Sequence, residues 1–211
     1  MKTGAGKTTV TVRGAVTWEA LKKELINLDK ETLAELVNTW VKNYWTNQSY
    51  WMVFTEERFG FQAAAELDQK VFSRTAQAQA HRIKKIFELG DDVQALAATL
   101  KFTAPQWVGA GFEWEFTDIS DTRLAMVIHR CPMGTYRKAN NLELLPCKEG
   151  SPPLYINLAR VINENFQVRC MHAHPDPPKE GVMCEWEFVL DNGSVKTEGL
   201  EHVVEQTPGQ R

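Results

Sequence analysis

The segments Gly111-Phe-Glu-Trp-Glu-Phe116 and Leu124-Ala-Met-Val-Ile-His129 decide the fold class. In the first segment apolar and acidic residues alternate, which is the pattern of a strand with one buried face. The second segment is an uninterrupted apolar run, typical of a strand that is buried more completely. The polar residues from Asp118 to Thr122 predict a turn between them. We therefore expect an antiparallel hairpin in the middle of the chain.

On the N-terminal side of this hairpin, apolar residues recur with a helical period. Between Leu33 and Trp45 they are spaced by three and four residues, which predicts a helix with one buried stripe. Asp29 is placed to cap the start of this helix. The segment from Phe61 to Leu89 is rich in Ala, Gln, Glu and Lys, and residues 73–75 are a candidate break within it. The expected helices are 18–28, 30–46, 50–58, 61–89 and 91–102.

On the C-terminal side of the hairpin, shorter helices and two further strands are expected. Pro152 and Pro153 fit the first turn of a helix, where proline is tolerated. Helices first and antiparallel strands later predict an α+β fold, in which an N-terminal helical layer is packed on a C-terminal antiparallel sheet. We expect an N-terminal extension 1–27, a single domain 28–190 and a polar tail 191–211. The expected segments after the hairpin are helices 133–140 and 152–164 and strands 166–171 and 182–190.

The composition of the 211 residues predicts a globular, cytoplasmic protein. Apolar residues make up 43% of the chain and seven residues are Trp, which is ample for a packed core. A net charge of -3, with no basic stretch, argues against nucleic acid and acidic membrane surfaces as partners. No apolar run is long enough to span a bilayer, and the N-terminus lacks the apolar core of a signal peptide. The sequence leaves open whether the protein is a homo-oligomer.

The segment Gly4-Ala-Gly-Lys-Thr-Thr9 resembles part of a phosphate-binding loop. A complete loop of that kind has a glycine at the place of Met1, follows a strand and opens a helix. The residues that come next, Val10-Thr-Val-Arg13, alternate like a strand instead. We therefore expect no nucleotide site here, and no other pattern supports a nicotinamide or flavin cofactor.

All four cysteines lie in less than a third of the chain, at Cys131, Cys147, Cys170 and Cys184. Thiolates are preferred ligands of soft and borderline metal ions, so their density predicts a metal site. Zinc is the first choice, and iron or an iron-sulfur cluster is the alternative. None of the cysteines forms a Cys-x-x-Cys motif, so the ligands would come from separate strand ends and loops. A cytosolic chain of this size does not need disulfides.

Two histidines, His172 and His174, follow Cys170 directly. If the strand continues, alternation places Cys170, His172 and His174 on the same side, where an imidazole could complete the metal site. The same residues could instead form a nucleophilic thiol paired with a histidine, with Asp176 orienting the imidazole. A third interpretation is that the cysteines are buried and structural, because free Cys is among the most buried residue types.

Four segments of the chain are specific enough to compare with known families: Phe59-Gly-Phe-Gln-Ala-Ala-Ala-Glu-Leu-Asp68, Arg130-Cys-Pro132, Pro146-Cys-Lys148 and the segment from Pro175 to Phe188. They resemble motifs of an uncharacterised bacterial and archaeal family, whose members are labelled cytosolic proteins and are grouped with L-2-amino-thiazoline-4-carboxylic acid hydrolase-like proteins. The resemblance covers about residues 28–190 and implies helices on an antiparallel sheet with a site lined by the four cysteines. Relatives can carry another cysteine just after the position of Cys170, where this chain has histidines, so the resemblance makes His172 or His174 a replacement ligand.

These features together predict a zinc-dependent hydrolase, or a related small-molecule enzyme, in which the metal activates water. Glu66, Asp68 and Asp176 are the candidates for proton transfer, although Glu66 and Asp68 are two residues apart and cannot share one helix face. The aromatic residues between Trp40 and Phe54 would line an apolar pocket or belong to the core. The alternative is a non-catalytic sensor or binding module, in which the cysteine site only ties strands together.

Overall fold

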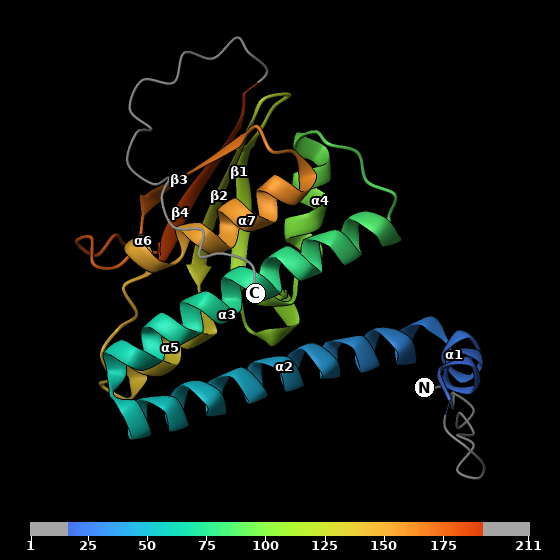
Figure 1. The fold of residues 1–211 in the computed structure, drawn as a ribbon, viewed down its shortest axis with the longest axis horizontal. Helices are drawn as coiled ribbons and strands as arrows, with labels where there is room; N and C mark the ends of the chain where they lie inside the picture. The colour runs from blue at the N-terminus through green and yellow to red at the C-terminus, as the bar shows by residue number, and fades with distance from the viewer. Residues whose placement is uncertain (1–16, 192–211) are drawn as a thin grey trace, which may run out of the picture.

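The computed structural model describes residues 17–191, and Figure 1 shows their arrangement. The first two helices, α1 (Trp18–Ile26) and α2 (Lys30–Phe59), both begin at a capping side chain. Thr17 Oγ1 accepts a hydrogen bond from the Ala20 amide at 3.2 Å. Asp29 Oδ1 accepts one from the Thr32 amide at 2.9 Å, so the predicted cap is confirmed. The loop-like segment 4–9 and the predicted tail after residue 191 lie outside the described residues.

Helix α2 is one continuous helix, so the predicted break between residues 46 and 50 is wrong. The polar residues of this stretch are accommodated by side-chain contacts rather than by a turn. The Thr46 hydroxyl donates to the Lys42 carbonyl at 3.0 Å, and the buried Gln48 amide donates to the carboxylate of Asp68. Tertiary packing therefore overrides the weak helix propensity of these residues. The helix ends at Gly60, whose φ of 85° is unfavourable for other residues.

Helix α3 (Phe61–Ile86) is also unbroken at Ser73. The Ser73 hydroxyl accepts a hydrogen bond from Asn157 Nδ2 at 2.6 Å and lies 3.3 Å from the Pro153 carbonyl. Both partners belong to α7 (Pro152–Ile162), which packs along α3. The polar residues in the middle of α3 thus mark a helix contact and not a break. The remaining helical elements are α4 (Val93–Phe102), α5 (Pro132–Ala139), α6 (Cys147–Gly150), and the 3₁₀ turns η1 (Ala104–Gln106) and η2 (Val108–Ala110).

The four strands form one antiparallel sheet with the order β1-β2-β4-β3. The predicted hairpin is present as β1 (Glu113–Ile119) and β2 (Arg123–Arg130), and the other two strands are β3 (Phe166–His172) and β4 (Cys184–Leu190). On the inner face of the sheet, the residue pairs in register are Leu124 with Phe188, Met126 with Trp186, and Ile128 with Cys184.

The helices cover one face of this sheet (Figure 1). Helices α4 and α7 contact the strands, α3 packs on α7, and α2 packs on α3 as the outermost layer. The protein therefore has the predicted α+β fold, with the difference that one covering helix, α7, comes from the C-terminal half. The opposite face of the sheet carries ion pairs, such as Arg123 with Glu187 at 2.7 Å and Lys179 with Glu185 at 2.6 Å.

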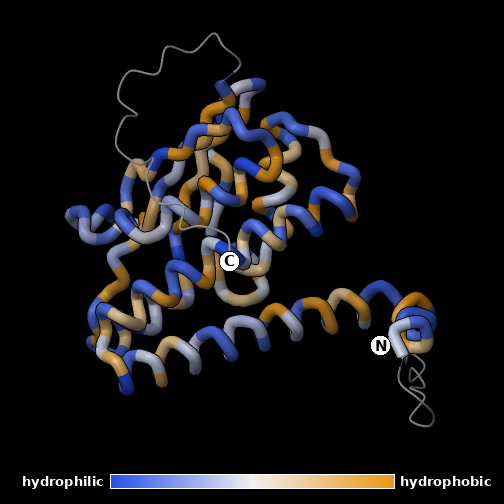
Figure 2. Tube along the Cα trace, in the orientation of Figure 1, coloured by the Kyte–Doolittle hydropathy of each residue, from blue (hydrophilic) through white to orange (hydrophobic). Residues whose placement is uncertain are grey.

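Helix α1 and the adjoining half of α2 extend away from the sheet (Figure 1). No residue of α1 is buried, and Gln48 is the first buried residue of α2. Figure 2 shows apolar segments along this part of the chain, and Trp18, Ile26 and Trp40 are exposed there. Within residues 17–191, no helix combines the length and the apolar character needed to cross a bilayer.

Candidate functional site

A pocket of about 150 Å³ lies between α3, the segment that contains α5 and α6, and the inner face of the sheet. Its wall is mainly apolar. Of the aromatic residues between Trp40 and Phe54, only Trp45 reaches it, while Tyr50, Trp51 and Phe54 are exposed. A cavity of this size holds a molecule about as large as benzene. The aromatic residues of the wall are Trp45, Phe72, Phe112, Tyr155 and Trp186.

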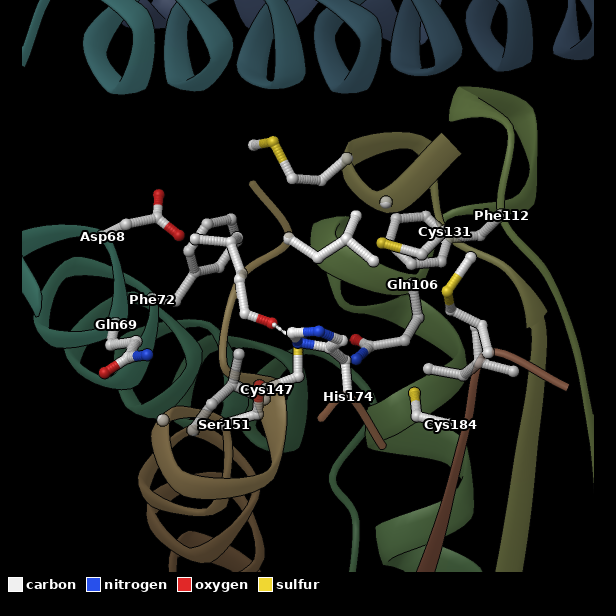
Figure 3. Close-up of a pocket in the computed structure, with 18 of the residues that line it drawn as sticks. Asp68, Gln69, Phe72, Gln106, Phe112, Cys131, Cys147, Ser151, His174 and Cys184 are labelled. Atoms are coloured by element: carbon white, nitrogen blue, oxygen red, sulfur yellow. Dashed lines mark hydrogen bonds between the residues drawn. The ribbon is translucent and has the colours of Figure 1, made fainter. Parts of the chain in front are cut away.

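Three of the four cysteines line this pocket (Figure 3), and each lies at or just before the start of a helix or a strand. Cys131 precedes α5, Cys147 is the first residue of α6, and Cys184 is the first residue of β4. The register of β2 with β4 places Cys184 opposite Ile128, close to the end of β2 from which Cys131 follows. The fourth cysteine, Cys170, lies on β3 outside the pocket wall.

Burial keeps the thiols of the pocket protonated. It raises the pKa of Cys147 to about 12, and it is also the main cause of the raised pKa of Cys131 and of Cys184. The neighbouring sulfurs raise the pKa of Cys147 and Cys184 further, because adjacent thiolates repel each other. A nucleophilic cysteine needs a lowered pKa, so this structure does not favour the thiol-nucleophile interpretation.

The His174 side chain stands at the pocket with a defined orientation (Figure 3). Its Nδ1 lies 3.1 Å from the carbonyl oxygen of Leu145, which accepts a hydrogen bond from this nitrogen. In the neutral ring this bond places the proton on Nδ1 and leaves the Nε2 lone pair to accept a proton or bind a metal ion. The His174 carbonyl in turn accepts a hydrogen bond from the Lys148 amide at 2.9 Å, which fixes the loop next to α6.

The predicted alignment of Cys170, His172 and His174 on one side is wrong. A register irregularity falls between Cys170 and His172, and β3 ends at His172. Only His174 reaches the pocket. His172 Nδ1 lies 3.8 Å from the carboxylate of Asp176, and Asp176 forms an ion pair with Lys148 that holds the pKa of this carboxyl below its usual value. Asp176 therefore stabilises the loop between β3 and β4 and does not line the pocket.

Asp68 is the carboxyl group that the structure places at the pocket (Figure 3). It is 6% exposed, and its Oδ1 accepts a hydrogen bond from Gln48 on α2. Burial raises the pKa of Asp68 to about 6, against the smaller opposing effects of Gln48 and Arg137. Glu66, the other candidate on α3, is exposed and accepts a hydrogen bond from Gln62 at 3.3 Å. The structure thus places Asp68 at the pocket and leaves Glu66 exposed to solvent.

Arg137 belongs to the pocket wall and was not singled out as a site residue from the sequence. Its side chain is 2% exposed and forms two hydrogen bonds to Glu56, at 2.8 and 3.0 Å. Its guanidinium also lies 4.9 Å from the centre of the Phe61 ring. The contact with Glu56 was not apparent in the sequence, because these residues are 81 positions apart. Arg137 is therefore neutralised by Glu56 while its field still favours an ionised Asp68.

The donors of the expected metal site are only partly assembled. Cys131, Cys147, Cys184 and His174 line one pocket, whereas Cys170 and His172 do not. Within residues 17–191, no three His, Cys, Asp or Glu side chains are grouped closely enough to hold a metal ion as they stand. Binding of zinc by the pocket thiols would therefore require their side chains to move toward one another.

The fold and the pocket define an α+β protein with a candidate small-molecule site built from helices and from strand ends. The chain belongs to DUF6125, a family of unknown function, whose model matches residues 24–190. No curated protein and no solved structure matches the chain significantly. The family match does not bear on the resemblance to thiazoline carboxylic acid hydrolase-like proteins, which stays a hypothesis.

Proposed function

We propose that the protein is an enzyme that acts on a small, mostly apolar molecule in this pocket, with Asp68 as the proton-transfer group. The observation that carries the proposal is a buried carboxyl group on the wall of an apolar pocket, with a pKa raised to about 6. A carboxyl group that titrates near the working pH can both accept and donate a proton. Perturbed groups of this kind concentrate at functional sites.

The geometry around Asp68 supports this role. Gln48 bonds one carboxylate oxygen and thereby fixes the orientation of the group. Within the described residues, the one hydrogen bond to this carboxylate is the bond to Oδ1, so the other oxygen is available to a ligand or to water in the pocket. A structural buried carboxylate is expected to have its hydrogen bonds filled by the protein itself.

Hydrolysis remains the proposed reaction class. Asp68 would take a proton from a water molecule that attacks the substrate and would return it to the leaving group. His174 at the same pocket offers a second acceptor through its free Nε2. Zinc is the proposed cofactor. Three of the pocket donors Cys131, Cys147, Cys184 and His174 would hold it, and the position left open would take a water molecule that the metal makes more acidic. The four free cysteines fit the proposed cytoplasmic location.

Turnover of small esters and amides tests this proposal. The probes are phenyl acetate and acetanilide, used with protein purified without oxygen and supplied with zinc. Asp68→Asn should lower the rate at least about 100-fold, the usual contribution of a general acid-base group. Glu66→Gln on the same helix is the matched control and should keep the wild-type rate. Equal rates for wild type and Asp68→Asn would exclude the proposed role of Asp68.

The second candidate is a non-catalytic binding or sensor module. The observation in its favour is that burial raises the pKa of all four cysteine thiols. Protonated thiols fit a structural role in the core better than a catalytic role. In that case the thiols stabilise the junction of α5, α6 and β4, and the pocket only holds a ligand. Binding of a small apolar molecule without turnover of either probe would support this candidate.

A further inference from the structure

One wall of the pocket carries a hydrogen-bond donor that the protein leaves unused. Among the described residues, four buried side-chain polar atoms lack a hydrogen-bond partner, and the indole Nε1 of Trp186 is the one that belongs to the pocket wall. Trp186 is 1% exposed, so bulk water does not compensate for the missing partner. A buried donor without an acceptor costs about 1 to 3 kcal/mol.

The position of this indole is fixed by the sheet. Trp186 lies on the inner face of β4 opposite Met126 of β2, and its ring centre is 4.4 Å from that of Tyr155 on α7. The sulfur of Cys184 lies two residues before it on the same face of β4, but among the described residues the indole N–H has no hydrogen-bond partner in the protein. Sulfur is a weak acceptor, so the N–H is available for a stronger one.

Tyr155 provides a second donor next to Trp186. The buried Gln106 Nε2 donates to the Tyr155 hydroxyl oxygen at 3.1 Å. At the other end of this amide, the Thr103 hydroxyl lies 2.5 Å from Gln106 Oε1 and 2.9 Å from the Leu100 carbonyl oxygen, and its hydrogen can go to either acceptor. The Tyr155 hydroxyl already accepts the bond from Gln106, so its own hydrogen is free to be donated. Within the described residues, this hydroxyl donates no hydrogen bond to another group.

We propose that Trp186 Nε1–H and Tyr155 O–H form a subsite for a hydrogen-bond acceptor, and that the ligand is a small, mostly apolar carbonyl compound. This inference rests on the proposed function, because it places the substrate in the same pocket. A carbonyl oxygen has two lone pairs and can accept from both donors at once. Two fixed donors of this kind also stabilise the negative charge that develops on a carbonyl oxygen during hydrolysis.

The charges of the wall favour a neutral carbonyl compound over a carboxylate. The Arg137 guanidinium, which would otherwise attract an anion, is paired with Glu56. Asp68 adds a carboxyl group to the same pocket and would repel a second one when ionised. A ketone, ester or amide is uncharged, so Asp68 does not repel it. Its carbonyl oxygen can still accept hydrogen bonds from Trp186 and Tyr155.

Two probes of the same shape test the subsite without any turnover. Cyclohexanone has a carbonyl oxygen, and methylenecyclohexane has a CH₂ group in its place. In the wild-type protein, cyclohexanone should shift the indole N–H resonance of Trp186 downfield, whereas methylenecyclohexane should not. Loss of one indole signal in Trp186→Phe assigns this resonance among the seven tryptophans.

Affinities of both probes for two variants complete the test. The ratio of ketone affinity to alkene affinity should fall about 3- to 10-fold in Trp186→Phe, the value of one neutral hydrogen bond. Trp45→Phe is the matched control, because Trp45 lies on the same wall and its N–H is committed to the Ala104 carbonyl at 3.3 Å. The control should keep the wild-type ratio.

Three outcomes would overturn the subsite: equal shifts with both probes, an unchanged ratio in Trp186→Phe, or no binding of cyclohexanone. The wild-type spectrum decides the first and third outcomes even if the Trp186 variant fails to fold. Turnover that depends on Asp68, without a preference for the ketone, would refute the subsite and leave the proposed function intact. A preference for the ketone without turnover of the esters and amides would support the subsite and refute the proposed function.

Discussion

Gln48 on α2 donates a hydrogen bond to the carboxylate of Asp68 on α3, and both residues are buried. This contact ties the outer helix to the inner one at the first buried position of α2. It also turns one carboxylate oxygen of Asp68 toward its neighbour helix and leaves the other to the pocket. A residue needed to hold two helices together thus also orients the group that we propose for proton transfer.

Asp68→Asn should remove a pH dependence from the stability of the protein. Burial raises the pKa of Asp68 to about 6, whereas an Asp in an unfolded chain titrates near ~4. Between these values the folded state binds the proton more tightly. The wild-type free energy of unfolding should therefore fall as the pH rises from about 4 to about 6, and stay low above that. Urea unfolding at a series of pH values measures this curve.

The asparagine variant should lack this fall and be more stable than wild type by about 2 kcal/mol at neutral pH. Glu66→Gln, an exposed substitution on the same helix, should keep the wild-type pH dependence. Parallel curves for wild type and Asp68→Asn would mean that Asp68 titrates normally, and would remove the basis for its proposed role.

Glu56→Gln should destabilise the protein by about 3 kcal/mol, because it leaves the buried guanidinium of Arg137 without its partner. The Arg137 side chain is 2% exposed, so water cannot replace the lost carboxylate. The control is Glu113→Gln, which breaks an exposed pair with Arg130 and should cost less than about 1 kcal/mol. Denaturant unfolding measures both. If Glu56→Gln lowered the free energy of unfolding as little as Glu113→Gln does, the Arg137 guanidinium would be in contact with water in solution.

Much of the fold could be predicted because the sequence pattern changes its period at residue 111. The alternation of Gly111–Phe116 and the apolar run 124–129 became the β1-β2 hairpin, and the helical spacing before them became helices. The break predicted near Gln48 was wrong because a polar residue in a helix can be buried against a partner 20 positions away. Local propensity contains no information about such a partner.

The site could be predicted only in part. The cysteines were recognised by their density, and three of them do line one pocket. Cys170 does not. The irregularity in β3 follows Cys170 and breaks the alternation on which its alignment with His172 and His174 depended. The free donors of Trp186 and Tyr155 left no signal in the sequence, since a missing partner becomes visible only in the packed structure.

The pocket thiols should react slowly with iodoacetamide at neutral pH. Burial raises the pKa of Cys147 to about 12 from the ordinary cysteine value of 9.0, which lowers its thiolate fraction about 1000-fold. Cys170 should react before Cys147, because it is less buried and its pKa is raised only to about 11. Peptide mapping after timed alkylation measures this order. Rapid labelling of Cys147 would instead restore the thiol-nucleophile interpretation.

Zinc binding should depend on the cysteines of the pocket and not on cysteine content alone. Protein purified without oxygen and supplied with zinc should retain about one ion per chain. Cys147→Ser should lose this ion, whereas Cys170→Ser should keep it, because Cys170 lies outside the pocket wall. The affinity should rise with pH, since the raised pKa of the thiols means that protons must leave before the metal binds. Metal analysis after dialysis measures the content, and equal retention or equal loss in the two variants would refute a zinc site in this pocket.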